Sequence, residues 1–143
     1  MEAPCRPEVT AALARGVQRL LMDHGLAPIL EMPLANGRRA DVAALGPKGE
    51  IWIVETKSCL ADYTTDCKWP DYLDFCDLFF FAVDEAFPQE LIPLEAGLIV
   101  ADGFGGAILR TPLASALAPA RRKMMTLSFA RLAAARLASS AIV

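Results

Sequence analysis

The chain has 143 residues, which is enough for one domain with a hydrophobic core and too few for two domains of ordinary size. Hydrophobic residues make up 55% of the sequence and charged residues 22%, a composition that excludes an intrinsically disordered chain. The formal net charge of −3 argues against nonspecific binding of nucleic acid by a basic surface, so any phosphate contact must be local.

The first part of the chain predicts a helix followed by three strands. Apolar residues recur at helical spacing over residues 8–24, and Gly25 is placed to end that helix. Strand candidates follow at 28–34, 38–45 and 51–57, separated by the turn sequences ANG and GPKG. The second and third of these strands predict a hairpin, which is antiparallel.

The middle of the chain predicts a helix and three more strands. A helical stretch over 68–77 precedes an apolar strand over 78–83, and further strands are expected around 98–102 and 106–110. A strand–helix–strand passage favours a parallel crossover, whereas a meander is antiparallel. We therefore expect an α/β fold with a mixed β-sheet flanked by helices.

The C-terminal segment predicts a helical extension from residue 113 onward, interrupted at Pro119. Its apolar stripe consists of Met125, Phe129, Leu132 and Leu137. We expect a single domain over residues 1–143, with a core at about 8–112 and the helical extension at about 113–140.

Location and cysteine chemistry follow from what the sequence lacks. No apolar run approaches the roughly 20 residues of a membrane-spanning helix, and the first residues lack the layout of a signal peptide, so we expect a cytoplasmic protein with no membrane contact. The cysteines show no CxxC pair and no zinc-site spacing. We expect reduced, packed thiols rather than a metal cluster at the four positions Cys5, Cys59, Cys67 and Cys76.

The turn GPKGE sets the register of the central hairpin. It fits a three-residue loop with Gly49 in the left-handed conformation, and counting outward places Asp41 opposite Glu55. Their Cβ atoms would then lie about 4.5–5.5 Å apart. Lys57 projects from the same face as Glu55, one pleat of roughly 7 Å further on. The same register pairs four apolar residues, Leu45 with Ile51 and Ala43 with Ile53.

Two carboxylates facing each other at the end of an apolar strand repel, and a divalent cation between them is the simplest remedy. Mg²⁺ fits because it is often bound by one or two carboxylates, with water and phosphate completing the shell. If ANG is also a three-residue loop with Gly37 left-handed, Glu31 lies beside Asp41 in the same row. A two-residue Asn36-Gly37 turn would instead send Glu31 to the other face.

Asp41, followed after thirteen residues by Glu55-Thr56-Lys57, resembles the PD-(D/E)XK nuclease signature, with Ala40 where the motif has proline. The segments RRADVAALGPKGEIWIVETKS, DCKWPDYLDFCDLFFFAV and GLIVADGFGGAILR resemble the MmcB-like DNA repair proteins of bacteria. That resemblance covers residues 8 to 125. It implies a restriction-endonuclease-like core and a role in the DNA damage response, in a fold that also has members without catalysis.

The resemblance implies roles for individual residues. Asp41 and Glu55 would bind Mg²⁺ or Mn²⁺, and Glu31 would complete the shell or hold a second metal. Lys57 would orient the attacking water or offset charge in the transition state. Lys68 would reach a phosphate or the rim of the site.

Other polar and aromatic residues have two interpretations each. Arg38 and Arg39 are either charged edge residues or phosphate contacts. Trp69 and Tyr72 fit the packing face of a helix better than a base-stacking platform.

Two functional hypotheses therefore remain. The first is a metal-dependent deoxyribonuclease that hydrolyses DNA phosphodiester bonds in repair, which the carboxylate–carboxylate–lysine set favours. The second is a catalytically inactive module of the same fold that binds a DNA structure or a repair partner, which the acidic pI of about 5.1 favours. The expected partners are DNA and other repair proteins, and a homodimer that would cut two strands stays open.

Overall fold

The structure is a computed structural model that describes residues 6–59 and 68–142. Each strand and the first helix lie within one residue of the sequence prediction. The elements in chain order are α1 (Pro7–Asp23), β1 (Ala27–Pro33), β2 (Arg39–Leu45), β3 (Ile51–Lys57), the 3₁₀ helix η1 (Trp69–Phe75), β4 (Leu78–Val83), the 3₁₀ helix η2 (Gln89–Leu91), β5 (Gly97–Ala101), β6 (Gly106–Arg110) and α3 (Pro119–Ile142).

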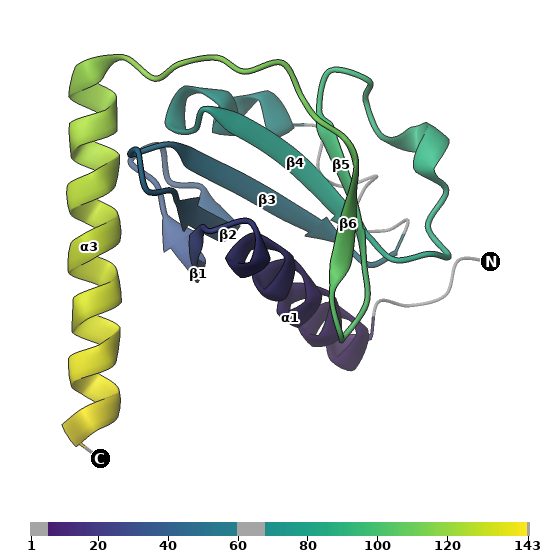
Figure 1. The fold of residues 1–143 in the computed structure, drawn as a ribbon, viewed down its shortest axis with the longest axis horizontal. Helices are drawn as coiled ribbons and strands as arrows, with labels where there is room; N and C mark the ends of the chain where they lie inside the picture. The colour runs from purple at the N-terminus through teal and green to yellow at the C-terminus, as the bar shows by residue number, and fades with distance from the viewer. Residues whose placement is uncertain (1–5, 60–67, 143) are drawn as a thin grey trace.

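The six strands form one mixed sheet in the order β1-β2-β3-β4-β5-β6. The first three strands are an antiparallel meander, β4 and β5 run parallel to β3, and β6 is antiparallel to β5. The expected α/β fold with an antiparallel meander and a parallel crossover is therefore confirmed. Figure 1 shows α1 lying across one face of this sheet and α3 standing beside its β1 end.

Each face of the sheet has its own hydrophobic core. On the α1 face, the helix stripe of Leu13, Val17 and Leu21 packs against strand residues that include Val54 and Phe80. The opposite core contains Phe79 and Phe81, and it is closed by η1 and by the first half of α3. Because both faces are covered, the central strands are apolar throughout, and a charged residue in them is exceptional.

The segment 68–77 is shorter and tighter than the α-helix predicted for it. It forms η1, in which Pro70 occupies the first turn. The expected packing role is confirmed, since Trp69 and Tyr72 stack on Phe79 with ring centroids 5.6 Å apart in both pairs. These two aromatic rings belong to the core and are not available as a base-stacking platform.

The prediction of a helix from residue 113 is wrong for residues up to 118, because residues 111–118 form a connector that is neither helix nor strand. Asp77 accepts hydrogen bonds from two backbone amides of this segment. Ser115 N donates to the Asp77 carbonyl at 3.1 Å, and Leu117 N donates to Asp77 Oδ1 at 3.0 Å. The helix then starts at Pro119 and is not broken by it, since proline is favoured in the first turn of a helix.

Asp77 also anchors α3 through Arg122. The guanidinium donates to both carboxylate oxygens, at 2.8 and 2.7 Å, and to the Gly49 carbonyl at 2.8 Å. Burial opposes ionisation of Asp77, but hydrogen bonds from Arg122, Ile51 N and Leu117 N outweigh it and lower the pKa of the carboxyl. Asp77 therefore joins the β3 start, the connector and α3 at one point.

Replacing Asp77 by alanine is expected to lower the free energy of unfolding by about 2–4 kcal/mol, because it leaves buried amides and a guanidinium without their acceptor. Chemical denaturation followed by circular dichroism measures this change. Asp74→Ala, which removes an exposed carboxylate three residues earlier, should change stability by less than about 0.5 kcal/mol. Equal effects of the two substitutions would contradict the anchoring role.

The helix α3 covers the edge of the sheet at β1. Met125 and Phe129 are buried in the core, and Arg136 donates to the carbonyls of Leu30 and Glu31 on the edge strand. This contact occupies backbone carbonyls of the edge strand β1 that would otherwise be available for pairing with a strand of another chain. The predicted apolar stripe fails at Leu137, which is 72% exposed, because the helix runs past the end of the sheet (Figure 1).

The cysteines differ from the expectation of four reduced, packed thiols. Cys76 is a buried free thiol, and burial raises its pKa to about 12. Cys59 is disulfide-bonded, so the expectation is wrong for that residue. Cys5 and Cys67 lie outside the described residues.

Within residues 6–59 and 68–142, none of the helices combines the length and the hydropathy that a membrane span requires.

Candidate active site at the end of β2 and β3

The predicted register of the β2–β3 hairpin is confirmed. The strand pairing ends next to Asp41 and Glu55, where the candidate site begins. Leu45 pairs with Ile51 and Ala43 with Ile53, and the ladder ends at Val42 and Val54. Beyond this pair the two strands are no longer paired, and side-chain carboxylates accept the hydrogen bonds of backbone amides. Asp41 N donates to Glu55 Oε2 at 2.6 Å, and Thr56 N donates to Asp41 Oδ2 at 2.9 Å.

The two acids therefore occupy the gap between the strand ends. Asp41 Oδ2 also accepts a hydrogen bond from the Thr56 hydroxyl at 3.2 Å. Each carboxylate binds the backbone of the other strand, which fixes both side chains at the point where the sheet opens. Such reciprocal contacts hold a site on rigid elements rather than on a loop.

The neighbouring strand β1 is twisted at the same level. The first hairpin has the three-residue loop, since Leu34 N donates to the Arg38 carbonyl and Gly37 has a φ of 86°. Leu30 contacts the α1-side core, but Met32, two residues later, lies in the opposite core. The residue between them, Glu31, has a φ of 52°, a left-handed conformation that is rare for a non-glycine residue.

The same reversal occurs across the pairing in β2. Val42, the partner of Leu30, lies in the α1-side core, and Ala40, the partner of Met32, lies in the other. Side-chain alternation is therefore broken at Asp41 as well as at Glu31. Backbone strain of this kind clusters at functional sites, where the surrounding structure holds it in place.

Glu55 and Lys57 are buried ionisable residues, with 4% and 6% of their surface exposed. Burial and repulsion from the Asp41 carboxylate raise the pKa of Glu55 to about 8, against smaller opposing effects of Tyr72, the Asp41 amide and Lys57. Burial also raises the pKa of Asp41, although Thr56 and Lys57 counteract it. Perturbed carboxyls in direct contact are a physical signature of functional sites.

Asp41 opens onto a cavity of about 410 Å³ beside the N-terminal half of α1. The cavity walls come from α1, β1, β2 and β3, and the polar residues among them are Arg6, Thr10, Glu31, Asp41 and Thr56. Glu55 lies deeper, between the strands. An approaching phosphate or cation would therefore meet Asp41 first.

The structure places Glu31 at the rim of this cavity. Its side chain is 64% exposed and lies 3.9 Å from the Arg39 guanidinium. In the described part of the chain, no group of three or more His, Cys, Asp or Glu side chains is arranged to hold a metal ion. A metal role for Glu31 stays a prediction, and its left-handed backbone explains why correct register alone does not bring the three acids together.

Asp41 and Glu55 suit a hard divalent cation, because both offer oxygen ligands and their mutual repulsion is relieved by positive charge. With two protein carboxylates, the remaining positions of a six-coordinate Mg²⁺ would belong to water and phosphate oxygens. The donor set is compatible with Mg²⁺ or Mn²⁺, whose binding stays a prediction, and it does not suit a closed zinc site.

Comparison with known proteins places the chain in a family. The family model described as DNA repair protein MmcB-like matches residues 2–142. The chain belongs to the MmcB-like DNA repair protein family. A solved structure described as SPO1766, a protein of unknown function from Silicibacter pomeroyi, is similar to it, with 51% identity, a TM-score of 0.85, and coverage of 87% of this chain and 86% of that one. No curated protein matches the sequence.

In this MmcB-like chain, none of the three predicted nucleic-acid contacts, Arg38, Arg39 and Lys68, is among the residues that line the cavity at Asp41. Arg38 pairs with Asp71 at 3.3 Å, so its charge is partly neutralised. Arg39 is mostly exposed beside Glu31. Lys68 is exposed at the start of η1. DNA contact by these three residues stays a prediction.

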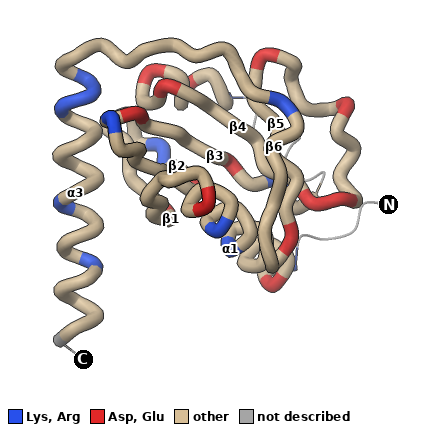
Figure 2. Tube along the Cα trace, viewed as in Figure 1, with Lys and Arg blue, Asp and Glu red and all other residues tan. Residues whose placement is uncertain are grey.

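Charge is segregated along the MmcB-like sequence. Residues 103–143 contain six basic residues and no acidic residue. In Figure 2 the basic positions recur along α3, whereas the acidic ones lie in the body of the domain. We call the cavity lined by Glu31 and Asp41 the acid cavity. Arg136 of this positive helix donates to the Glu31 carbonyl, so its side chain reaches one of the residues that line the acid cavity.

Proposed function

We propose that this MmcB-like protein is a metal-dependent nuclease that hydrolyses DNA phosphodiester bonds in repair. The observation that supports it most is the acid pair of partly buried Asp41 and buried Glu55, each held by the backbone of the other's strand, with Lys57 two residues beyond Glu55. A protein that only bound DNA would gain nothing from keeping two acids in repulsive contact. Family membership supports the repair role.

The protein residues would divide the work of hydrolysis. Asp41 and Glu55 would hold Mg²⁺, which when bound supplies polarisation of a phosphate and a lowered pKa of water. Asp41 faces the cavity through which a phosphate would enter. Lys57 is close enough to favour the charged forms of both acids, and its ammonium group would stabilise negative charge on the reacting phosphate.

The second candidate function is a catalytically inactive module that binds a DNA structure or a repair partner. Three observations favour it: the net charge of −3, the ion pairs of Arg38 and Arg39, and the absence of a three-ligand cluster among the described residues. In that case the acid pair would serve only to accept hydrogen bonds from the unpaired backbone amides at the ends of β2 and β3.

The two functions are distinguished by incubating the full chain with single-stranded, duplex and branched DNA, with Mg²⁺ or Mn²⁺ and with EDTA. Metal-dependent cleavage of at least one substrate is the expected result. Binding without cleavage of any substrate would support the inactive module.

A further inference from the structure

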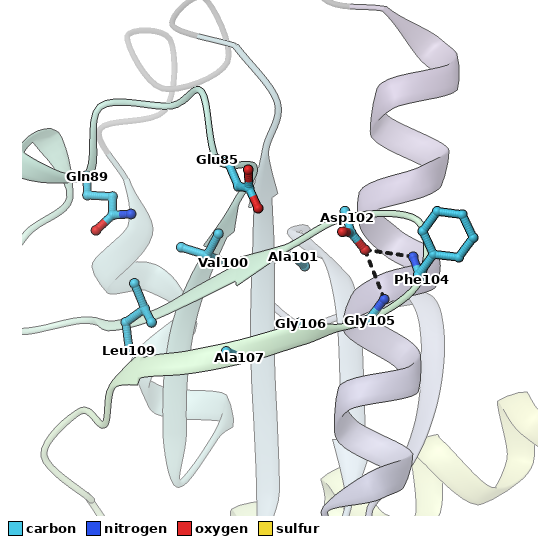
Figure 3. Close-up of a pocket in the computed structure, with 10 residues that line it drawn as sticks. All are labelled: Glu85, Gln89, Val100, Ala101, Asp102, Phe104, Gly105, Gly106, Ala107 and Leu109. Carbon is cyan, nitrogen blue, oxygen red and sulfur yellow. Dashed lines mark hydrogen bonds between the residues drawn. The ribbon is translucent and has the colours of Figure 1, made fainter.

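The β5–β6 turn exposes an aromatic ring at its tip. Phe104 is 84% exposed, although burial of a phenylalanine side chain contributes about 2–3 kcal/mol to stability. Figure 3 shows its ring on the α1 side of the turn, away from Leu109. A large aromatic side chain presented to solvent in this way is suited to contact a ligand.

Hydrogen bonds fix the backbone of the turn that carries the ring. Asp102 Oδ1 accepts hydrogen bonds from Phe104 N at 2.8 Å and Gly105 N at 3.1 Å, as drawn in Figure 3, and Asp102 N donates to the Gly105 carbonyl. Gly16 of α1 lies directly under the turn, since a Cβ atom there would be 1.8 Å from the Asp102 carbonyl oxygen. The turn therefore packs on the helix without intervening side chains.

Two arginines flank the ring. A cavity of about 670 Å³ lies between α1 and the turn, and Arg15, Gln18, Arg19, Gly103 and Phe104 are among the residues that line it. Arg15 Nη2 is 3.6 Å from the position of a Cβ on Gly103, so the guanidinium reaches the base of the turn. Both arginines are exposed, and within the described residues neither forms an ion pair.

The opposite side of the turn is different in charge. It is lined by Glu85 and Gln89, as Figure 3 shows, and carries no basic residue. Two carboxylates belong to these elements: Asp102 in the turn, whose Oδ1 is bound by two amides, and Asp23 at the end of α1. An anionic ligand that contacts Phe104 would therefore approach over α1.

We propose that Phe104, Arg15 and Arg19 form a binding site for single-stranded DNA. An unpaired base stacks on the Phe104 ring, and the two guanidinium groups contact the flanking phosphates. Aromatic stacking platforms beside basic grooves bind unpaired strands without sequence preference. This site rests on the proposed DNA function and adds to it an unpaired strand as the bound form.

The position of α1 connects this site to the acid cavity. Thr10 and Ala14 line the acid cavity, and Arg15 and Arg19 line the Phe104 cavity. Thr10 and Arg15 are five residues apart, which is about 7.5 Å along the helix axis at 1.5 Å rise per residue. The two cavities therefore lie on neighbouring parts of α1.

The test is fluorescence anisotropy of the full chain with a fluorescein-labelled oligothymidylate, in EDTA so that no cleavage occurs. Phe104→Ala should raise Kd about 5- to 150-fold, the equivalent of losing one stacked base. Phe104→Trp should retain binding and quench 2-aminopurine placed in the oligonucleotide. Leu113→Ala, which truncates an apolar side chain that is 89% exposed elsewhere, should bind like the wild type.

The arginines have a separate readout. Arg15→Gln and Arg19→Gln should each reduce the slope of log affinity against log salt concentration by about 0.7, the value expected for one phosphate contact on a single strand. Unchanged slopes would show that the guanidinium groups do not contact phosphate, and would overturn their part in the site.

The proposal is overturned if the wild type does not bind the oligonucleotide, or if Phe104→Ala binds as tightly as Leu113→Ala. Either result would favour a protein partner for the exposed ring. The nuclease proposal is tested independently, because the anisotropy is measured without metal. Phe104-dependent binding by a chain that cuts no DNA would refute the nuclease alone, and cleavage with Phe104-independent binding would refute this site alone.

Discussion

Replacing Asp41 by asparagine or Glu55 by glutamine is expected to reduce Mg²⁺-dependent DNA cleavage by at least about 100-fold. Each substitution keeps the shape of the side chain and removes the charge that would bind the cation. Lys57→Met is expected to lower the cleavage rate by about 10²–10³-fold, which is the usual effect of removing one group that stabilises transition-state charge. Initial rates on the substrate that the wild type cuts best measure these losses.

The matched control is Glu90→Gln, which removes an exposed carboxylate in η2. It should leave the rate unchanged. All variants should be checked for a wild-type circular dichroism spectrum, since Glu55 and Lys57 are buried. Cleavage at the wild-type rate by a folded Asp41→Asn or Glu55→Gln variant would exclude the proposed site.

The stability of the wild type should fall as pH rises from about 4.5 to about 8. The folded chain keeps Glu55 protonated over this interval because its pKa is raised to about 8, whereas the unfolded chain has already released the proton. Since the unfolded state binds fewer protons there, the free energy of unfolding decreases with pH. The decrease is about 5 kcal/mol as an upper bound.

Thermal unfolding at a series of pH values measures this effect. Glu55→Gln should be less sensitive to pH over the interval and more stable than the wild type at pH 8. Asp77, whose pKa is lowered, gives the opposite trend, with stability lost only as the pH falls towards and below 4. A wild type and a Glu55→Gln variant that respond equally to pH between 5 and 8 would contradict the raised pKa.

The position of the acid pair was predictable from the hairpin sequence. The glycine at position 49 fixes the loop, the loop fixes the register, and the register puts Asp41 next to Glu55. The predicted position follows from turn geometry and side-chain alternation alone. It therefore holds for as long as the strands stay regular.

The placement of Glu31 was beyond such reasoning because the strands do not stay regular. The register of β1 is the expected one, but the left-handed backbone at Glu31 reverses the alternation. Nothing in the sequence marks that conformation, since the residue is neither glycine nor asparagine. The connector before α3 was missed for a related reason, because Asp77, distant in sequence, provides its hydrogen-bond acceptors.

The Phe104 site was missed although its residues are visible in the sequence. Arg15 and Arg19 lie one turn apart on α1, but their relation to a turn about ninety positions later depends on the contact at Gly16. Only the packing of helix against turn brings them to one cavity. A glycine within an amphipathic helix was the available signal of a close approach.

The central claim is that Asp41 and Glu55 together bind one divalent cation, and calorimetric titration of the full chain with Mn²⁺ at pH 8 tests it most directly. The wild type is expected to bind one Mn²⁺, with release of protons from the acid pair, and Asp41→Asn and Glu55→Gln are expected to lose that binding. Equal binding by the wild type and both variants, or no binding by the wild type, would contradict the claim.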